Sequence, residues 1–408
     1  MNNIKFRLII MNFLQYAVWG AWLVSLGAYL GQGSLDFTGL QIGSFFATMG
    51  IASLFMPAIV GIIADRWIPA QILLAICHLF SGAFIAAASF QTSYELLYPL
   101  MLLSVCFYMP TIALTNAVAY NALEKEHLNP VTAFPPIRVW GTVGFIVAMW
   151  VVDLMHYTVS SNQLVLSAIL SLFLAVYSLT LPNCPVCKVS NEVNRSWVDA
   201  FGLRAFTLFK KKKMAIFFVF SMLLGMSLQI TNAFANSYLL NFGSNPEFAN
   251  TFGVEHSTML ISLSQISETF CILLIPFFLK RYGIKIVMLI SMFAWVLRFG
   301  LLGTGDPGSG VWMLVLSMIV YGVAFDFFNI SGSLYVEQET GPEIRSSAQG
   351  VFMIMTNGFG AFIGSYVAGV VVDKYHWPDS WFIFAGYAMI VTILFWILFD
   401  YKHERNKA

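Results

Sequence analysis

The sequence predicts an all-α polytopic membrane protein, with 12 transmembrane helices in two six-helix bundles. Of its 408 residues, 59% are hydrophobic and only 10% are charged, against roughly 25% charged in a typical soluble domain. A soluble chain this apolar could not cover its own core, whereas a surface that faces lipid must itself be apolar. Apolar segments of membrane-spanning length recur along the chain, and a polar, basic stretch separates six of them from six more.

Each membrane-spanning helix needs about 20 mostly apolar residues. By that measure the predicted spans are 8–31, 40–64, 70–90, 96–120, 131–152, 163–181, 214–240, 256–279, 285–304, 311–336, 346–372 and 380–400. The domains are therefore an N-terminal bundle (1–181), a cytoplasmic linker loop (182–213) and a C-terminal bundle (214–408). The first apolar run is too long for the hydrophobic part of a signal peptide, so we expect it to remain as a membrane helix.

The distribution of Lys and Arg between the loops predicts the orientation. If the N-terminus is cytoplasmic, 18 basic residues face the cytoplasm, and Lys374 alone lies on the opposite side. Because cytoplasmic loops carry an excess of Lys and Arg, both termini are predicted to be cytoplasmic. This pattern predicts a multi-pass membrane protein.

Several function classes have no support in the sequence. The net charge of +1 does not provide the basic face that nucleic-acid binding needs. No Walker A pattern is present, so ATP is not expected to drive the protein. Cys184 and Cys187 have C-x-x-C spacing without a second pair, and we predict neither a metal nor a cofactor. His78 is the only histidine in the interior of a predicted span, and no catalytic Ser/His grouping is evident, so an enzyme is not expected.

Two short basic loops occupy equivalent positions in the two halves. Gly61-Ile-Ile-Ala-Asp65-Arg66 follows the second span, and Leu279-Lys-Arg-Tyr-Gly-Ile-Lys285 follows the eighth. The first resembles the G-x-x-x-D-R loop of the major facilitator superfamily, and the second resembles a degenerate repeat of it. Internal repeats of this kind are typical of alternating-access carriers. Asp65 and Arg66 are therefore predicted to be gating or structural loop residues; the alternative is that they only solvate a tight turn.

Two carboxylates fall near the middle of predicted spans, Glu268 in the eighth and Asp326 in the tenth. A carboxylate within the membrane is costly unless it is protonated, paired or hydrated. We therefore predict that Glu268 and Asp326 are proton-coupling residues. The alternative is a structural pair that joins two helices.

Two arginines also fall inside predicted spans. The fifth span reaches membrane-spanning length only if it includes Pro135 and Pro136, and this places Arg138 within the membrane beside a proline kink. Arg138 is then available to a carboxylate or a substrate, unless it extends to the cytoplasmic interface. Arg298 in the ninth span is interpreted as structural, with no partner evident in the sequence.

Amides and aromatic residues accompany the charged residues within the spans. In the seventh span Gln229, Asn232 and Asn236 have offsets that place them on one helix face, and Gln265 shares a face with Glu268. Amides between membrane helices often serve only in packing. The aromatic residues in nearby spans are Phe145, Tyr321 and Phe325. Such a lining suits a neutral ligand with hydroxyls and a flat ring, which fits a nucleoside and also a sugar.

Longer stretches resemble the nucleoside:H+ symporter family of the major facilitator superfamily. They include Phe134-Pro-Pro-Ile-Arg-Val-Trp-Gly-Thr142, Ser264-Gln-Ile-Ser-Glu-Thr269 and Tyr321-Gly-Val-Ala-Phe-Asp-Phe-Phe-Asn-Ile-Ser-Gly332, and the resemblance covers essentially the whole chain. It implies a nucleoside site between the two bundles. The residues that it implies for substrate binding are Arg138, Thr142, Phe145, Gln229, Asn232, Gln265, Glu268, Tyr321, Phe325 and Asp326.

The expected function is proton-coupled uptake of a purine or pyrimidine nucleoside by alternating access. Protonation of Glu268, Asp326 or both would lower the cost of closing the outer gate over a dry site, so the proton serves as the coupling ion. Apart from the substrate, protons and the lipid bilayer, no partner is expected, and the protein is expected to act as a monomer. Two alternatives remain: a sugar:proton symporter of the same fold, and a sensor that binds nucleosides without transporting them.

Overall fold

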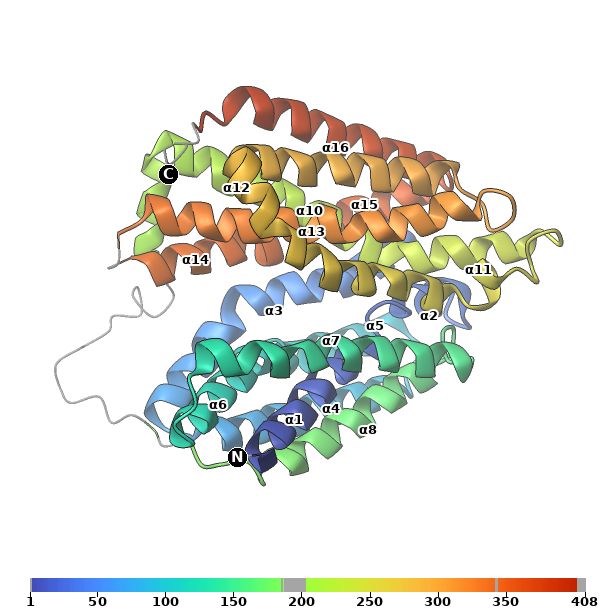
Figure 1. The fold of residues 1–408 in the computed structure, drawn as a ribbon. Coiled ribbons are helices and arrows are strands. Elements are labelled where there is room, and N and C mark those ends of the chain that lie inside the picture. Colours follow the sequence, from blue (N-terminus) through green and yellow to red (C-terminus); the bar gives the residue numbers. More distant parts are fainter. Residues whose placement is uncertain (1, 185, 187–202, 342–343, 402–408) are drawn as a thin grey trace. The chain divides into compact units, whose positions relative to one another are not determined.

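In the computed structural model, which describes residues 2–184, 186, 203–341 and 344–401, the chain is helical, and no strand occurs among these residues. The chain forms two compact units. Unit 1 comprises residues Met1–Phe37 and Thr48–Ser196, and unit 2 comprises Thr38–Ala47 and Trp197–Ala408. Most helices within each unit run along a common direction (Figure 1), as expected for helices that cross the same bilayer.

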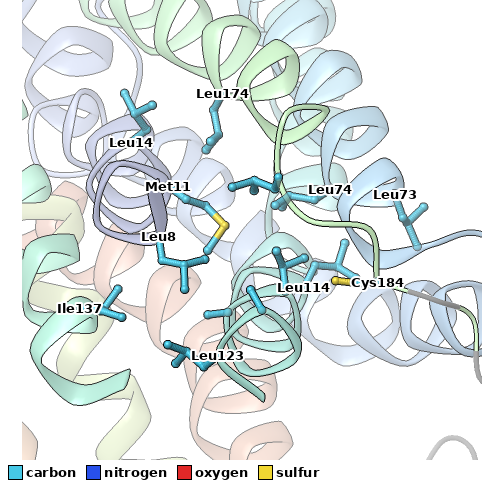
Figure 2. Close-up of a cluster of buried hydrophobic side chains, with 14 of the residues drawn as sticks. Leu8, Met11, Leu14, Leu73, Leu74, Leu114, Leu123, Ile137, Leu174 and Cys184 are labelled. Atoms are coloured by element: carbon cyan, nitrogen blue, oxygen red, sulfur yellow. The ribbon is translucent and has the colours of Figure 1, made fainter. Parts of the chain in front are cut away.

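Unit 1 contains the helices of the first half of the chain. They are α1 (Asn2–Gly20), α2 (Leu26–Gln32), α3 (Gly39–Arg66, whose first residues through Ala47 belong to unit 2), α4 (Ala70–Ala88), α5 (Tyr94–Tyr108), α6 (Thr111–Lys125), α7 (Pro130–Leu154) and α8 (Asn162–Ser178). A buried cluster fills the space between α1, α4, α6 and α8, with Leu8, Met11, Leu74 and Leu174 at its centre (Figure 2).

Unit 2 contains the helices of the second half. They are η1 (Leu203–Lys210), α10 (Lys212–Asn241), η2 (Phe242–Ser244), α11 (Phe252–Glu255), α12 (Ser257–Thr304), α13 (Val311–Glu339), α14 (Arg345–Met353), η3 (Ile354–Gly360), α15 (Ala361–Tyr375) and α16 (Asp379–Leu398). The long α12 consists of two helices that meet at Gly283, where φ is 78° and ψ is 170°. This backbone conformation is nearly exclusive to glycine and allows the chain to reverse between two spans.

The helices account for the 12 predicted crossings within the described residues. Nine helical stretches are long and apolar enough to cross a membrane, and one of them, Ser257–Thr304, supplies two crossings through its turn at Gly283. The remaining two crossings are the consecutive helices α1 and α2 and the shorter apolar helix α8. The predicted all-α fold with 12 spans is confirmed.

Three predicted spans are not single α-helices. The first is interrupted at residues 21–25, where the Ser25 hydroxyl donates a hydrogen bond to Gln163 Oε1 at 2.8 Å. The fourth is divided into α5 and α6 at Pro110, which lacks a backbone donor. The eleventh contains the π-helical stretch η3, whose wider turn separates α14 from α15. Hydropathy alone predicted continuous helices at all three places.

Glycines bring the first and fifth spans of each half into backbone contact. In unit 1, a Cβ on Gly144 of α7 would overlap the carbonyl oxygen of Phe13 in α1. In unit 2, a Cβ on Gly225 of α10 would overlap the carbonyl oxygen of Thr356 in η3, and Gly364 also lies close to the backbone of Met226. Small residues that allow backbones to approach are typical of helix pairs in membranes. The same pair of spans is therefore packed by the same means in both units.

Candidate functional site

The two carboxylates predicted within the membrane both lie in unit 2. Asp326 on α13 has 4% of its surface exposed, and within the described structure its Oδ2 accepts no hydrogen bond. Glu268 on α12 is half-buried and interacts electrostatically with Asp326. A buried carboxylate whose oxygen has no donor is costly when ionised. Two negative charges side by side in a membrane-spanning unit would be costly.

Tyr321 lies at the centre of the polar and aromatic side chains around the acids. Its buried ring stacks on Phe325, with ring centres 5.8 Å apart and planes inclined by 9°, and it meets Trp295 edge-on at 6.0 Å. The Gln265 side chain lies near the Tyr321 hydroxyl, and Glu268 interacts electrostatically with Tyr321. The predicted residues of α12 and α13 therefore form one group, with flat aromatic faces beside carboxylates and an amide.

Arg298 has the partners that the sequence did not reveal. Its side chain is 2% exposed, and its guanidinium carbon lies 4.7 Å from the centre of the Tyr321 ring. Its Nη1 donates to the carbonyl oxygen of Ser317 at 2.7 Å and to the hydroxyl of Ser264 at 3.4 Å. Arg298 thus places a fixed cation directly behind Tyr321 and joins the two halves of α12 to α13.

The three amides of α10 have different environments. Gln229 is buried, and in the described structure its Oε1 accepts no hydrogen bond, while Asn232 is half-buried. Asn236 instead donates to the Thr258 hydroxyl at 2.9 Å and accepts from the Ser257 hydroxyl at 2.7 Å. Asn236 therefore joins α10 to α12, and Gln229 retains an acceptor that a ligand can use.

The predicted residues of unit 1 lie on α7, the helix that contains Pro135 and Pro136. The Arg138 guanidinium lies over the ring of Tyr16 on α1, 3.9 Å from its centre. Thr142 is half-buried, and Phe145 is buried and meets Trp19 edge-on at 6.3 Å. The contact of Arg138 with Tyr16 joins two spans far apart in sequence, and the sequence analysis did not identify it.

A buried hydrogen-bond network lies behind these residues in unit 1. His78 Nε2 donates to Gln15 Oε1 at 2.8 Å, which requires the nitrogen to carry a proton, and the Thr115 hydroxyl donates to the same oxygen at 3.1 Å. His78 Nδ1 lies 3.1 Å from the Ser171 hydroxyl. Tyr108 donates its hydroxyl to the Gln15 backbone carbonyl at 2.7 Å. The network fixes α1 directly beside Tyr16, and periodicity alone did not predict it.

The loop motif and the C-x-x-C pair are described only in part by the structure. Asp65 and Arg66 end α3; Arg66 is exposed, and the Asp65 side chain lies outside the described part. Among the described residues no group of three or more His, Cys, Asp or Glu could hold a metal ion. Cys184 is a free thiol beyond α8; burial raises the pKa of this thiol, and nearby Lys125 partly offsets that rise. Cys187, the second cysteine of the C-x-x-C spacing, lies outside the described residues.

Comparisons with known proteins cover the full length of the chain. The family model described as "Nucleoside H+ symporter" matches residues 1–404. The nucleoside permease NupG of Escherichia coli (strain K12) is 50% identical over 410 residues, which are 99% of this chain and 97% of NupG. The xanthosine permease of the same organism is also 50% identical, over 99% of this chain and 98% of its own length. A crystal structure of the nucleoside transporter NupG superposes with a TM-score of 0.92 and covers 98% of this chain and all of that one.

Proposed function

The chain belongs to the Nucleoside H+ symporter family, and from that premise we propose that it takes up purine or pyrimidine nucleosides together with protons. It is a secondary transporter of the major facilitator fold and not an enzyme. The observation that carries the proposal is the buried carboxylate of Asp326, which lies beside Glu268 and whose Oδ2 accepts no hydrogen bond from the described residues.

We place proton coupling on Glu268 and Asp326. With two acids within electrostatic range of each other, a single proton relieves both the repulsion between them and the burial cost of one charge. Uptake of that proton from outside would permit the site to close in its dry form. Release of the proton to the cytoplasm would restore the charge and favour reopening.

Substrate binding is assigned to the side chains that combine flat rings with polar groups. In unit 2 the stacked Tyr321 and Phe325 offer faces to a nucleobase, and Gln229, Asn232 and Gln265 offer amide groups to base or ribose. In unit 1 the same role is assigned to Arg138, Thr142 and Phe145. These assignments match the chemistry of a nucleoside, which is neutral, flat at one end and rich in hydroxyls at the other.

The cellular setting of the proposal is the bacterial inner membrane, with both termini in the cytoplasm and the protein acting as a monomer. Residues 1–181 and 214–408 are proposed to act as the two bundles of an alternating-access cycle, joined by residues 182–213. The loop residues Asp65 and Arg66 are assigned to gating. The excess of basic residues on the proposed cytoplasmic side supports this orientation.

The experiment that tests the function is uptake of radiolabelled uridine and adenosine into proteoliposomes, with and without an inward proton gradient. Accumulation that depends on the gradient and that a protonophore abolishes is the expected result. Competition by excess sugars but not by nucleosides would instead indicate a sugar symporter. Saturable binding without accumulation would indicate a sensor.

Replacement of the acids tests the coupling assignment. Asp326→Asn and Glu268→Gln keep the size of each side chain but remove its ability to exchange a proton. We expect at least one of the two variants to lose gradient-driven accumulation while still exchanging labelled for unlabelled nucleoside across the membrane. If both variants accumulate substrate against its gradient as the unmodified protein does, neither acid couples protons.

A further inference from the structure

An apolar groove of about 470 Å³ lies on unit 2 between α12, α13 and α16. It is formed by Ile286, Leu289, Ile290, Phe293, Ala294, Leu297, Val320, Val323 and Thr392. Several of these side chains face outward: Ile286, Phe293 and Leu297 each have 43–45% of their surface exposed. The groove is separate from the site around Tyr321 and has no role in the proposed transport mechanism.

The length of the groove matches one leaflet of a bilayer. The six residues from α12 recur at offsets of three and four, so they form one stripe along the helix. From Ile286 to Leu297 this stripe is about 16 Å long at 1.5 Å per residue. The hydrocarbon core of a bilayer is about 30 Å thick, so the stripe has the depth of a single acyl chain.

The groove has no polar atom available for a water-soluble ligand. Thr392 is the one polar residue in its lining, and the Thr392 hydroxyl donates to the carbonyl of Ala388 in its own helix at 2.7 Å. Every other lining side chain is a hydrocarbon. In a membrane-spanning unit, such a groove suits a lipid chain.

One end of the groove is basic. Lys285 directly precedes Ile286, and its Nζ donates to the carbonyl oxygen of Trp396 at 3.1 Å; among the described residues this is its one acceptor, and an ammonium group carries three donors. Lys280 and Arg281 are exposed at the turn beside Gly283. Basic residues at the end of a groove between membrane helices attract anionic headgroups.

We propose that this groove binds one acyl chain of an anionic phospholipid, whose headgroup phosphate is bound by Lys285 and Arg281. The length of the apolar stripe matches that of one acyl chain, and the basic residues at its end favour a negatively charged headgroup. Given the proposed orientation, the lipid belongs to the cytoplasmic leaflet. The site is independent of nucleoside binding, so its test does not depend on transport.

The test measures lipid retained by the purified full-length protein, by native mass spectrometry in detergent with added dioleoyl phosphatidylglycerol or dioleoyl phosphatidylcholine. We expect preferential retention of phosphatidylglycerol. Each basic residue near a membrane surface contributes about a five-fold factor in lipid affinity. Arg281→Gln and Lys285→Gln should each weaken retention by about that factor, and the control Lys211→Gln should not change it.

A second variant tests the chain site separately from the headgroup. Leu289→Trp fills the groove and should abolish retention with the basic residues intact, whereas Ile390→Trp, on the exposed face of α16 outside the groove, should not. Dihexanoyl phosphatidylglycerol has the same headgroup and much shorter chains, and we expect it to bind more weakly. Equal retention of the two dioleoyl lipids, or unchanged retention in Leu289→Trp, would overturn the proposal.

Discussion

Two neighbours position Arg138 without adding a charge: Tyr16 provides a ring face, and Gly141 leaves room for the guanidinium. The Tyr16 ring lies against one face of its guanidinium, an arrangement that favours the cation electrostatically. A Cβ on Gly141, one turn along α7, would lie 2.6 Å from a ring carbon of Tyr16 and 2.8 Å from Nη1 of Arg138. The absence of a side chain at residue 141 therefore allows this pair to form.

Gly141→Ala should displace Arg138 from its position without removing it. We expect the KM for nucleoside to rise about ten-fold, because a shift of about an ångström in a binding group is costly, while the protein still folds. Uptake kinetics in proteoliposomes measure the effect. Gly386→Ala is the matched control, since no atom lies within 4 Å of the position that its methyl group would take. Equal KM values in the two variants would contradict the positioning role of residue 141.

The buried hydrogen-bond network of unit 1 depends on the Gln15 side chain. Gln15→Leu removes the acceptor of His78 Nε2 and the amide that donates to the Thr111 hydroxyl, and an orphaned buried polar group costs about 1–3 kcal/mol. We expect a clear fall in the thermal-unfolding midpoint in detergent. Thr392→Val is the control, because that hydroxyl bonds only within its own helix; a similar fall in both would argue against a stabilising network.

At the scale of an element, the turn inside α12 depends on one backbone conformation. Gly283→Ala places a methyl group at φ 78° and ψ 170°, where strain costs about 1–3 kcal/mol. Gly300→Ala lies in the helical part of α12 with open space around it, and Ala there should stabilise by about 0.5–1 kcal/mol. Thermal unfolding should therefore shift in opposite directions, and shifts of the same sign would contradict this account.

Hydropathy predicted where the chain crosses the membrane but not how each crossing is built. A window of about 20 residues averages over Pro110 and over η3, because both segments remain apolar while their hydrogen bonding changes. Buried charges were also predictable, since Asp326 and Arg298 are costly wherever they face lipid. Their partners were not, because the contacts of Arg298 with Tyr321 and of Arg138 with Tyr16 depend on the packing of helices distant in sequence.

At the scale of the whole molecule, the orientation in the membrane can be tested with introduced cysteines. The described native thiols of Cys77, Cys184 and Cys271 are buried and that of Cys106 is half-buried, and a background with all five cysteines replaced by serine removes any residual labelling. Glu247→Cys lies in the exposed segment after α10, and Lys211→Cys lies before it. A membrane-impermeant maleimide added to intact spheroplasts should label residue 247 only. Labelling of residue 211 instead would reverse the proposed topology.

The glycine contacts between the first and fifth spans limit which substitutions the chain can accept. Gly144 lies on the fifth span of unit 1 and Gly225 on the first span of unit 2, and each meets the backbone of the partner span. A Cβ at either position would overlap a backbone carbonyl oxygen, so any larger residue would separate the helix pair. Chains that pack these two spans in the same way are therefore expected to keep glycine at both positions.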